Sequence, residues 1–324
     1  MSSDHAQDWN NYWQGRSAKA SGNALLGVGI ENNDVLTTFW QNIFSNVPKS
    51  TQLVDFACGA GSVLKQAKAA GLSNLTGIDV SKNAIDVLKH KIPTAIGHVG
   101  AVDNTPFETD SFDMVVSQFG FEYAGDRSDI MAAVREMTRI VKPSGQIVLV
   151  SHIKEGAIAR GCQQSLEHIT RVIKSGFFES AKDCFNIIAK SQKATRQADK
   201  DAVIQAMTRL NDKAEPIMVW LRQAGDSKQE FVRFTYHLLE STHKLLVNLN
   251  NFHLKDCLTW LDDMRSEVLA YEGRMTSMLG AAISEELALR ISEDISSNNA
   301  EVSRPEKLYF VDGDLPAAWV LRTH

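Results

Sequence analysis

Two aspartates and two glycines are spaced as they are in sites that hold a nucleotide. Asp55 lies in an apolar run, residues 53–56, that is followed by Gly59 and Gly61, and Asp79 comes about twenty residues after this turn. Glycine has no Cβ, so the backbone can turn tightly and a ligand can approach its N–H groups. A carboxylate one strand away can accept hydrogen bonds from ribose hydroxyls. Each piece alone also fits a plain turn, but together they indicate a nucleotide-binding crevice.

An alternation of strands and helices must position these residues. Strands are predicted over residues 53–56, 75–78, 95–99, 112–116 and 146–150, and helices over 34–44, 62–70, 81–90 and 129–140. Short apolar strands that alternate with helices are typical of a parallel sheet covered on both faces. We expect Ser62 to cap the helix after the glycine turn. Pro143-Ser144-Gly145 predicts a turn before the fifth strand.

The second half of the chain has helical periodicity without a convincing strand. Helices are predicted over residues 158–174, 177–190, 201–222, 229–249, 254–273 and 284–296. Pro216 is expected to kink or divide the third of these helices. In the tail, residues 307–311 and 317–321 predict a hairpin. An isolated hairpin is marginally stable, so we expect it to complete the sheet.

The predicted fold class is α/β, with a Rossmann-like, doubly wound and mostly parallel sheet, a C-terminal antiparallel hairpin and an all-α insertion domain. Residues 1–34 would form an N-terminal cap segment. Residues 35–154 and 301–324 would form the sheet domain, and residues 155–300 the helical insertion. The insertion is expected to act as a lid over the crevice that recognises a substrate, or as a dimerisation surface.

Composition and charge exclude some classes of function. The chain has 324 residues, a net charge of −5 and no dense basic run, which disfavours a nucleic-acid binder. The four cysteines are scattered and match no zinc or disulfide spacing. No apolar run approaches the ~20 residues of a membrane span. The N-terminus is polar and acidic, unlike a signal peptide, so the expected location is cytoplasmic.

The chain resembles the class I S-adenosylmethionine-dependent methyltransferases, particularly the subgroup that includes the ubiquinone and menaquinone C-methyltransferases. Residues 54–61 resemble the family's first motif, with Ala57 at the first glycine position, and residues 77–81 resemble its second motif. Residues 103–120 resemble the subgroup's run through the fourth strand, and residues 141–145 resemble its following turn. The resemblance covers these blocks and the C-terminal tail, and it does not extend to the helical insertion.

The resemblance implies S-adenosyl-L-methionine as methyl donor, S-adenosyl-L-homocysteine as product, and no metal. The glycine loop would hold the methionine part, Asp55 its amino group directly or through water, and Asp79 the ribose. Ile78 and Val80 would flank the adenine. Ala101 stands where the family often has an acidic residue or Asn. Asp103 would then either replace that carboxylate or only cap the following loop. The expected cofactor-binding residues are Tyr12, Arg16, Asp55, Ala57, Gly59, Gly61, Asp79, Val80, Val102, Asp103, Gln118 and Phe119.

Methyl transfer from a sulfonium is an in-line displacement, so the enzyme must mainly hold the reactants in line and exclude water. A general base is needed only where the acceptor must lose a proton. His152 and Tyr123, which follow strand ends, are the catalytic candidates, and Glu122 is a weaker one. A histidine after a strand is also often a structural hydrogen-bonding residue.

The acceptor is expected to be a small or medium organic molecule methylated on O, N, S or C. No Asp/Asn-Pro-Pro-aromatic motif follows the fourth strand, which disfavours a DNA amino-methylating enzyme. Most aromatic residues of the insertion are expected in its core, and Arg274 and His237 are its polar candidates. The alternatives are an inactive cofactor-binding protein whose helical region binds a partner, and a protein or RNA methyltransferase.

Overall fold

A computed structural model describes residues 34–124, 130–191, 196–225, 230–296, 303–310 and 314–323. Its described residues form two compact units. The first contains residues 34–162 and 276–323, and the second contains residues 163–275, within the described ranges. The predicted cap segment, with Tyr12 and Arg16, lies outside the described residues apart from residue 34.

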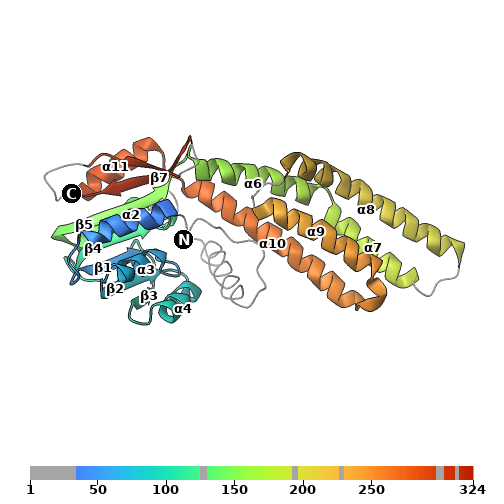
Figure 1. The fold of residues 1–324 in the computed structure, drawn as a ribbon, viewed down its shortest axis with the longest axis horizontal. Coiled ribbons are helices and arrows are strands. Elements are labelled where there is room, and N and C mark those ends of the chain that lie inside the picture. The colour runs from blue at the N-terminus through green and yellow to red at the C-terminus, as the bar shows by residue number, and fades with distance from the viewer. Residues whose placement is uncertain are drawn as a thin grey trace. The chain divides into compact units, whose positions relative to one another are not determined.

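The first unit is built on a seven-stranded sheet with the order β3-β2-β1-β4-β5-β7-β6 (Figure 1). The first five strands in the chain run parallel to one another. Strand β7 pairs antiparallel with both β5 and β6. The mostly parallel sheet and the C-terminal hairpin that completes it are therefore confirmed. The strands are β1 Gln52–Phe56, β2 Asn74–Asp79, β3 Ile96–Val99, β4 Phe112–Gln118, β5 Val141–His152, β6 Glu306–Tyr309 and β7 Pro316–Arg322.

The predicted turn at residues 143–145 is wrong, since this stretch belongs to β5. Pairing with β4 passes from Phe112–Val141 directly to Met114–Gln146, so the residues between form an irregularity of the strand. Pro143 has no N–H to donate to a neighbouring strand, which explains why regular pairing begins only after it.

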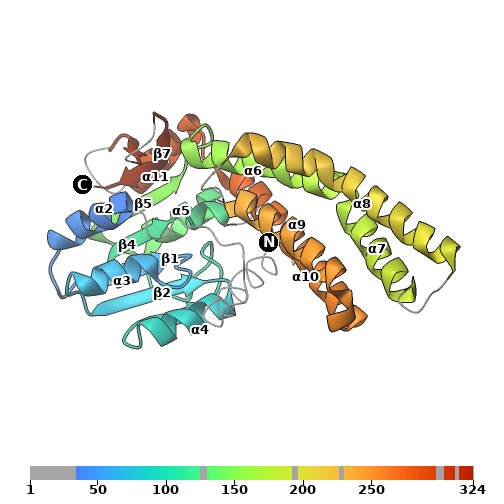
Figure 2. The same ribbon diagram turned by 45° about the vertical axis from the view of Figure 1, so that its right-hand side comes forward.

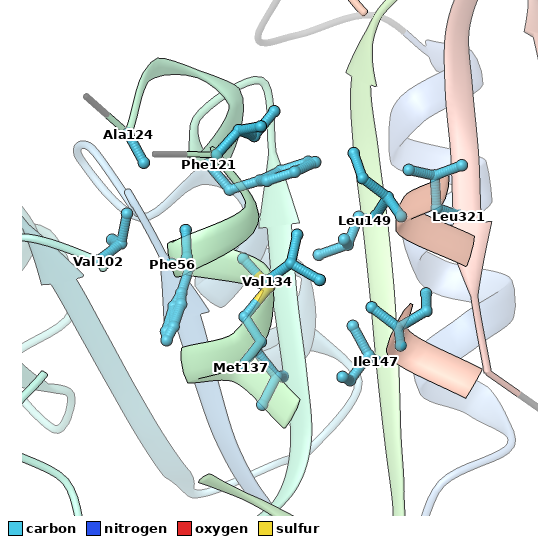
Figure 3. Packing of buried hydrophobic residues seen from close by; sticks show 14 of the residues in the cluster. Phe56, Val102, Phe121, Ala124, Val134, Met137, Ile147, Leu149 and Leu321 are labelled. Atoms are coloured by element: carbon cyan, nitrogen blue, oxygen red, sulfur yellow. The ribbon is translucent and has the colours of Figure 1, made fainter. Parts of the chain in front are cut away.

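Helices cover both faces of the sheet. On one face lie α2 Asp34–Ser45, α3 Ser62–Ala69 and α4 Lys82–Lys91, which share a buried cluster with β1 and β2. Figure 2 shows α3 and α4 beside β2. On the other face, α5 Ile130–Ile140 packs through Val134 and Met137 against Ile147 and Leu149 of β5 (Figure 3). Both faces of the central strands are thus buried, as their apolar sequences predict.

Helix α11, Glu285–Ser296, differs from its expected place in the helical insertion. It packs against α5 and β7 in the first unit. Its residues Ala288, Ile291 and Ile295 recur at helical spacing and are buried in the same cluster as Leu321 of β7. The sheet face beside β7 needs an apolar cover, and this stripe supplies one.

The second unit is helical. Its helices are α6 Ala157–Lys174, α7 Phe177–Ser191, α8 Gln197–Ala224, α9 Glu230–Val247 and α10 Leu254–Ala281 (Figure 1), and the division between the units falls within α6 and α10. Phe231 of α9 stacks on Tyr271 of α10 with ring centroids 5.7 Å apart. Pro216 lies inside α8 without dividing it. None of the helices in the described part of the chain has the length and apolar character needed to cross a membrane.

Candidate functional site

The loop after β1 is held to the end of β2 through the Asp79 carboxylate. The Gly59 N–H donates to Asp79 Oδ2 at 2.9 Å, and the Ser81 N–H donates to Asp79 Oδ1 at 2.8 Å. The Cys58 N–H donates to the Ile78 carbonyl at 3.0 Å, which extends the contact between the two strands. Asp79 thereby fixes the path of the glycine loop from the neighbouring strand.

The backbone of this loop takes conformations that suit glycine. Ala57, Gly59 and Gly61 have φ values of 53°, 51° and 80°, all in the left-handed region. A Cβ on Gly61 would also lie 2.4 Å from Leu88 Cδ1, so the Leu88 side chain would have to shift to accommodate another residue. Ala57 adopts the conformation at a cost of about 1–2 kcal/mol. The predicted cap by Ser62 is wrong, because Gly61 is the N-cap residue of α3 and no side-chain bond caps the helix.

Two buried carboxylates lie beside the loop. Burial raises the pKa of Asp55 well above its usual range, and the charge of Asp79 raises this pKa further. Burial also raises the pKa of Asp79, against the opposing effect of hydrogen bonds from the Ser81 and Gly59 N–H groups. Neighbouring buried carboxylates repel each other when both are ionised, so a cation that binds there is favoured.

The segment after β3 is fixed by two charged residues of α5 that sequence analysis missed. Glu136 Oε1 accepts hydrogen bonds from the Thr105 N–H at 2.8 Å and from its hydroxyl at 2.6 Å. Arg139 donates to Glu136 Oε1 at 2.6 Å and to the Phe107 carbonyl at 2.8 Å. These bonds lower the pKa of Glu136 to about 2, with the Arg139 hydrogen bond as the largest cause. The signal in the sequence that could have identified Glu136 and Arg139 is an acid–base pair at i,i+3 spacing on an amphipathic helix.

The same segment carries two of the expected cofactor residues. The Val102 side chain is buried in the cluster that contains Phe56 and Phe121 (Figure 3). A role of Val102 in holding the cofactor stays a prediction. Asp103 is half-buried, as is Val80 after β2.

The end of β4 contacts the loop after β1. The Ser117 hydroxyl donates to the Phe56 carbonyl at 2.7 Å. A Cβ on Gly120 would lie 2.6 Å from the Ala57 Cβ, so the two backbones approach closely only because residue 120 is glycine. The expected Gln118 is held from α2, where Trp40 Nε1 donates to its Oε1 at 2.6 Å. This contact, between residues far apart in the chain, has no signal in the sequence.

The two expected catalytic residues meet at the end of β5. His152 is 3% exposed, and its ring stacks on Phe119 with centroids 4.3 Å apart. The Tyr123 ring contacts the His152 ring edge-on, with the two centroids 5.9 Å apart. Glu122 Oε1 lies 2.8 Å from His152 Nδ1 and accepts the His152 N–H at 3.0 Å. Phe119 holds a left-handed φ of 52°, which turns the chain between β4 and the Glu122 segment.

The structure thus brings together most of the expected residues of the described part. Asp55, Asp79 and the glycine loop form one group, and Phe119, Tyr123 and His152 form another. The Ala57–Gly120 contact connects them. Within the described ranges, no three His, Cys, Asp or Glu side chains gather as metal ligands do.

Comparison with known proteins finds similarity in the first half of the chain. Residues 54–149 match the family model Methyltransf_11, a methyltransferase domain. A demethylmenaquinone methyltransferase of Staphylococcus aureus is 36% identical over 108 residues, which is 32% of this chain and 43% of the relative. An uncharacterized methyltransferase of Schizosaccharomyces pombe is 26% identical over 150 residues, which is 46% of this chain and 58% of the relative. The chain thus spans about half the length of the curated relatives that it matches.

Solved structures give weaker likenesses. A putative S-adenosyl-L-methionine-dependent methyltransferase from Methanococcus maripaludis is 20% identical, with a TM-score of 0.33 over 36% of this chain and 54% of that chain. The complex between the Haloferax volcanii Trm112 methyltransferase activator and a putative methyltransferase gives 23% identity and a TM-score of 0.37 over 44% of this chain and 60% of that chain. These scores are too low to support an inference about this protein. Residues 54–149 are thus similar to a methyltransferase domain, in agreement with the resemblance of the sequence motifs to the class I S-adenosylmethionine-dependent methyltransferases.

Proposed function

We propose that this protein transfers a methyl group from S-adenosyl-L-methionine to a small or medium organic acceptor and releases S-adenosyl-L-homocysteine. The observation that carries the proposal is the bond from the Gly59 N–H to Asp79. It sets a glycine loop with left-handed residues against a buried carboxylate at the carboxyl edge of a parallel sheet, where such sheets bind nucleotides. The methyltransferase domain match over residues 54–149 supports the same conclusion.

The residues present suit this methyl donor. It supplies an activated methyl group on a positively charged sulfur and also carries an ammonium group, and Asp55 and Asp79 form an acidic pair that favours a cation. In this proposal Asp79 accepts hydrogen bonds from the ribose, and Asp55 holds the amino group directly or through water. The loop from Ala57 to Gly61 lets its N–H groups approach the ligand closely.

The remaining roles follow from position along the sheet edge. Val80 and the Val102 backbone would bound the adenine, and Asp103 has either the ligand role or the loop-capping role. Gln118 and Phe119 would line the face where transfer occurs. The main contribution of these residues to the rate is to orient the reactants and exclude water. Tyr12 and Arg16 stay predictions from sequence.

Titration calorimetry with S-adenosyl-L-homocysteine tests the proposal. We expect saturable binding to the full chain, and no detectable binding would overturn the proposed function. Asp79→Asn should weaken binding by about 1–3 kcal/mol, because a hydrogen bond to a charged group is lost. Asp86→Asn is the matched control, since Asp86 lies on the exposed surface of α4 and pairs only with Lys82 among the described residues.

A second pair of ligands separates a ribose role for Asp79 from its role in holding the loop. Wild-type protein should bind adenosine more tightly than 2′-deoxyadenosine, and Asp79→Asn should lose this preference. If the variant keeps the full preference while binding both ligands weakly, Asp79 only holds Gly59 in place.

A further inference from the structure

We propose that Trp40 is a positioning residue for the methyl donor, and that Gln118, which Trp40 holds, donates hydrogen bonds to the carboxylate of the donor's amino-acid group. This inference rests on the proposed function and deepens it, because it assigns a binding residue to each end of that group. The observation behind it is the hydrogen bond from Trp40 Nε1 to Gln118 Oε1, which is 2.6 Å long.

This bond fixes the orientation of the Gln118 amide. The indole nitrogen of tryptophan only donates, so the Gln118 atom that meets it must be the carbonyl oxygen. The NH₂ group at the other end of the amide is then directed away from Trp40, and Nε2 has no hydrogen-bond partner among the described residues. Gln118 is half-buried, and Nε2 is not one of the fully buried atoms without a partner, so it reaches accessible space.

Trp40 is itself held rigidly. It is 1% exposed, contacts the Phe39 ring edge-on with centroids 5.1 Å apart, and stacks on the Phe44 ring at 5.4 Å. Its helix α2 lies over the strands that flank the crevice (Figure 1), and Trp40 shares a buried cluster with Val116 of β4. A rotated Gln118 amide would leave the buried indole N–H without a partner, which is costly. Trp40 therefore holds the amide in one orientation.

Gln118 and Asp55 lie on the same face of the sheet. Asp55 of β1 is paired with Val116 of β4, and Gln118 is two residues further along β4. Side chains two residues apart on a strand point to the same face, and this spacing puts the two Cα atoms about 8 Å apart. One face of the sheet edge thus carries a carboxylate from β1 and an amide donor from β4.

The charges of these groups select what each one binds. The amino-acid end of S-adenosyl-L-methionine has an ammonium group and a carboxylate. Asp55 and Asp79 attract the ammonium and repel the carboxylate, so the carboxylate needs a neutral or positive donor. The NH₂ group of Gln118 is such a donor, and a hydrogen bond to an ionised acceptor is stronger than one between neutral groups. Asp55 would therefore bind the ammonium, and Gln118 the carboxylate.

The experiment compares two ligands that differ only in this carboxylate. Titration calorimetry on the full chain uses S-adenosyl-L-homocysteine and its decarboxylated analogue, S-adenosyl-3-thiopropylamine, which keeps the amino group. Gln118→Glu keeps the size of the side chain and an oxygen for Trp40, but it replaces the NH₂ donor by an acceptor. We expect it to weaken S-adenosyl-L-homocysteine binding about 10–100-fold without weakening binding of the analogue. Asp55→Asn should weaken binding of both ligands.

Trp40→Phe tests the positioning role. The variant keeps an aromatic ring but removes the donor that orients the Gln118 amide. We expect S-adenosyl-L-homocysteine to bind about 2–10-fold more weakly and the analogue to bind as before. Leu36→Val is the control, because Leu36 is 2% exposed on the same helix and contributes packing without a side-chain hydrogen bond. It should leave both affinities unchanged, as would loss of a merely structural role of Trp40.

A measurement on wild-type protein does not depend on the folding of a variant in the ligand-bound state. In ¹H–¹⁵N spectra, the Gln118 NH₂ resonances, assigned by their loss in Gln118→Glu, should shift with S-adenosyl-L-homocysteine and not with the analogue. Equal shifts with both ligands, equal weakening of both by Gln118→Glu, or an unchanged affinity ratio in Trp40→Phe would overturn the inference. Absence of S-adenosyl-L-homocysteine binding to the wild-type chain would instead overturn the proposed function.

Discussion

Replacing Glu136 by Gln tests how the segment after β3 is held. Glu136 is 8% exposed and receives bonds from Thr105 and from Arg139, which also binds the Phe107 carbonyl. Gln keeps the shape of the side chain but loses the charge that pairs with the guanidinium. The protein should therefore become less stable at neutral pH, with the largest effect close to Val102 and Asp103.

The magnitude follows from the pKa of Glu136, which is lowered from 4.5 to about 2. At 1.36 kcal/mol for each pH unit, this difference corresponds to about 3.4 kcal/mol at pH 7. The Arg139 side chain is 36% exposed, so solvent screening leaves about half of that figure. Because the pKa is lower in the folded state, the stabilisation is complete above the unfolded pKa near 4.5 and is lost as the pH falls toward 2. At pH 3.5 about 40% of it is gone.

The assay is urea unfolding of the wild-type and Glu136→Gln proteins at pH 7, 4.5 and 3.5, followed by circular dichroism. We expect a difference in unfolding free energy of about 1.5–2 kcal/mol at pH 7 that shrinks at pH 3.5. Asp86→Asn, which removes an exposed i,i+4 pair with Lys82, should cost less than about 0.5 kcal/mol. A Glu136→Gln difference that is equally small, or that does not change with pH, would refute the reasoning.

Three other changes probe the site. Asp55→Asn should raise Tm at pH 7, because the raised pKa of Asp55 means that its buried charge is unfavourable there. The same change should weaken binding of S-adenosyl-L-methionine. A lower Tm in calorimetric scans would contradict the stability prediction. Gly120→Ala should cost about 1–3 kcal/mol in urea unfolding, since its Cβ would lie 2.6 Å from that of Ala57, and Ala57→Gly in the same chain should restore part of the loss. Trp40→Phe should cost about 0.5–1.5 kcal/mol, because Gln118 loses its donor, and unchanged stability would show that solvent replaces the bond.

Local patterns in the sequence predicted the main elements of the first unit and the class of the domain. The apolar strands, the helices between them and the glycine loop each depend on residues close together in the chain, so periodicity and turn chemistry identify them. The same holds for Asp79, whose distance from the loop follows from one strand–helix–strand unit. The tail hairpin was also predictable, because a pair of short strands needs a sheet to join.

Tertiary structure decided the contacts that depend on sheet order and register. Glu122 and His152 are thirty positions apart in sequence, and they meet because the segment after β4 folds against the end of β5. Helix α11 has an ordinary amphipathic pattern, which does not say whether it faces other helices or the sheet. Sequence periodicity specifies which face of an element is apolar. The partner of that face is set by the folding of the whole unit, and so is the partner of each polar side chain at its edge.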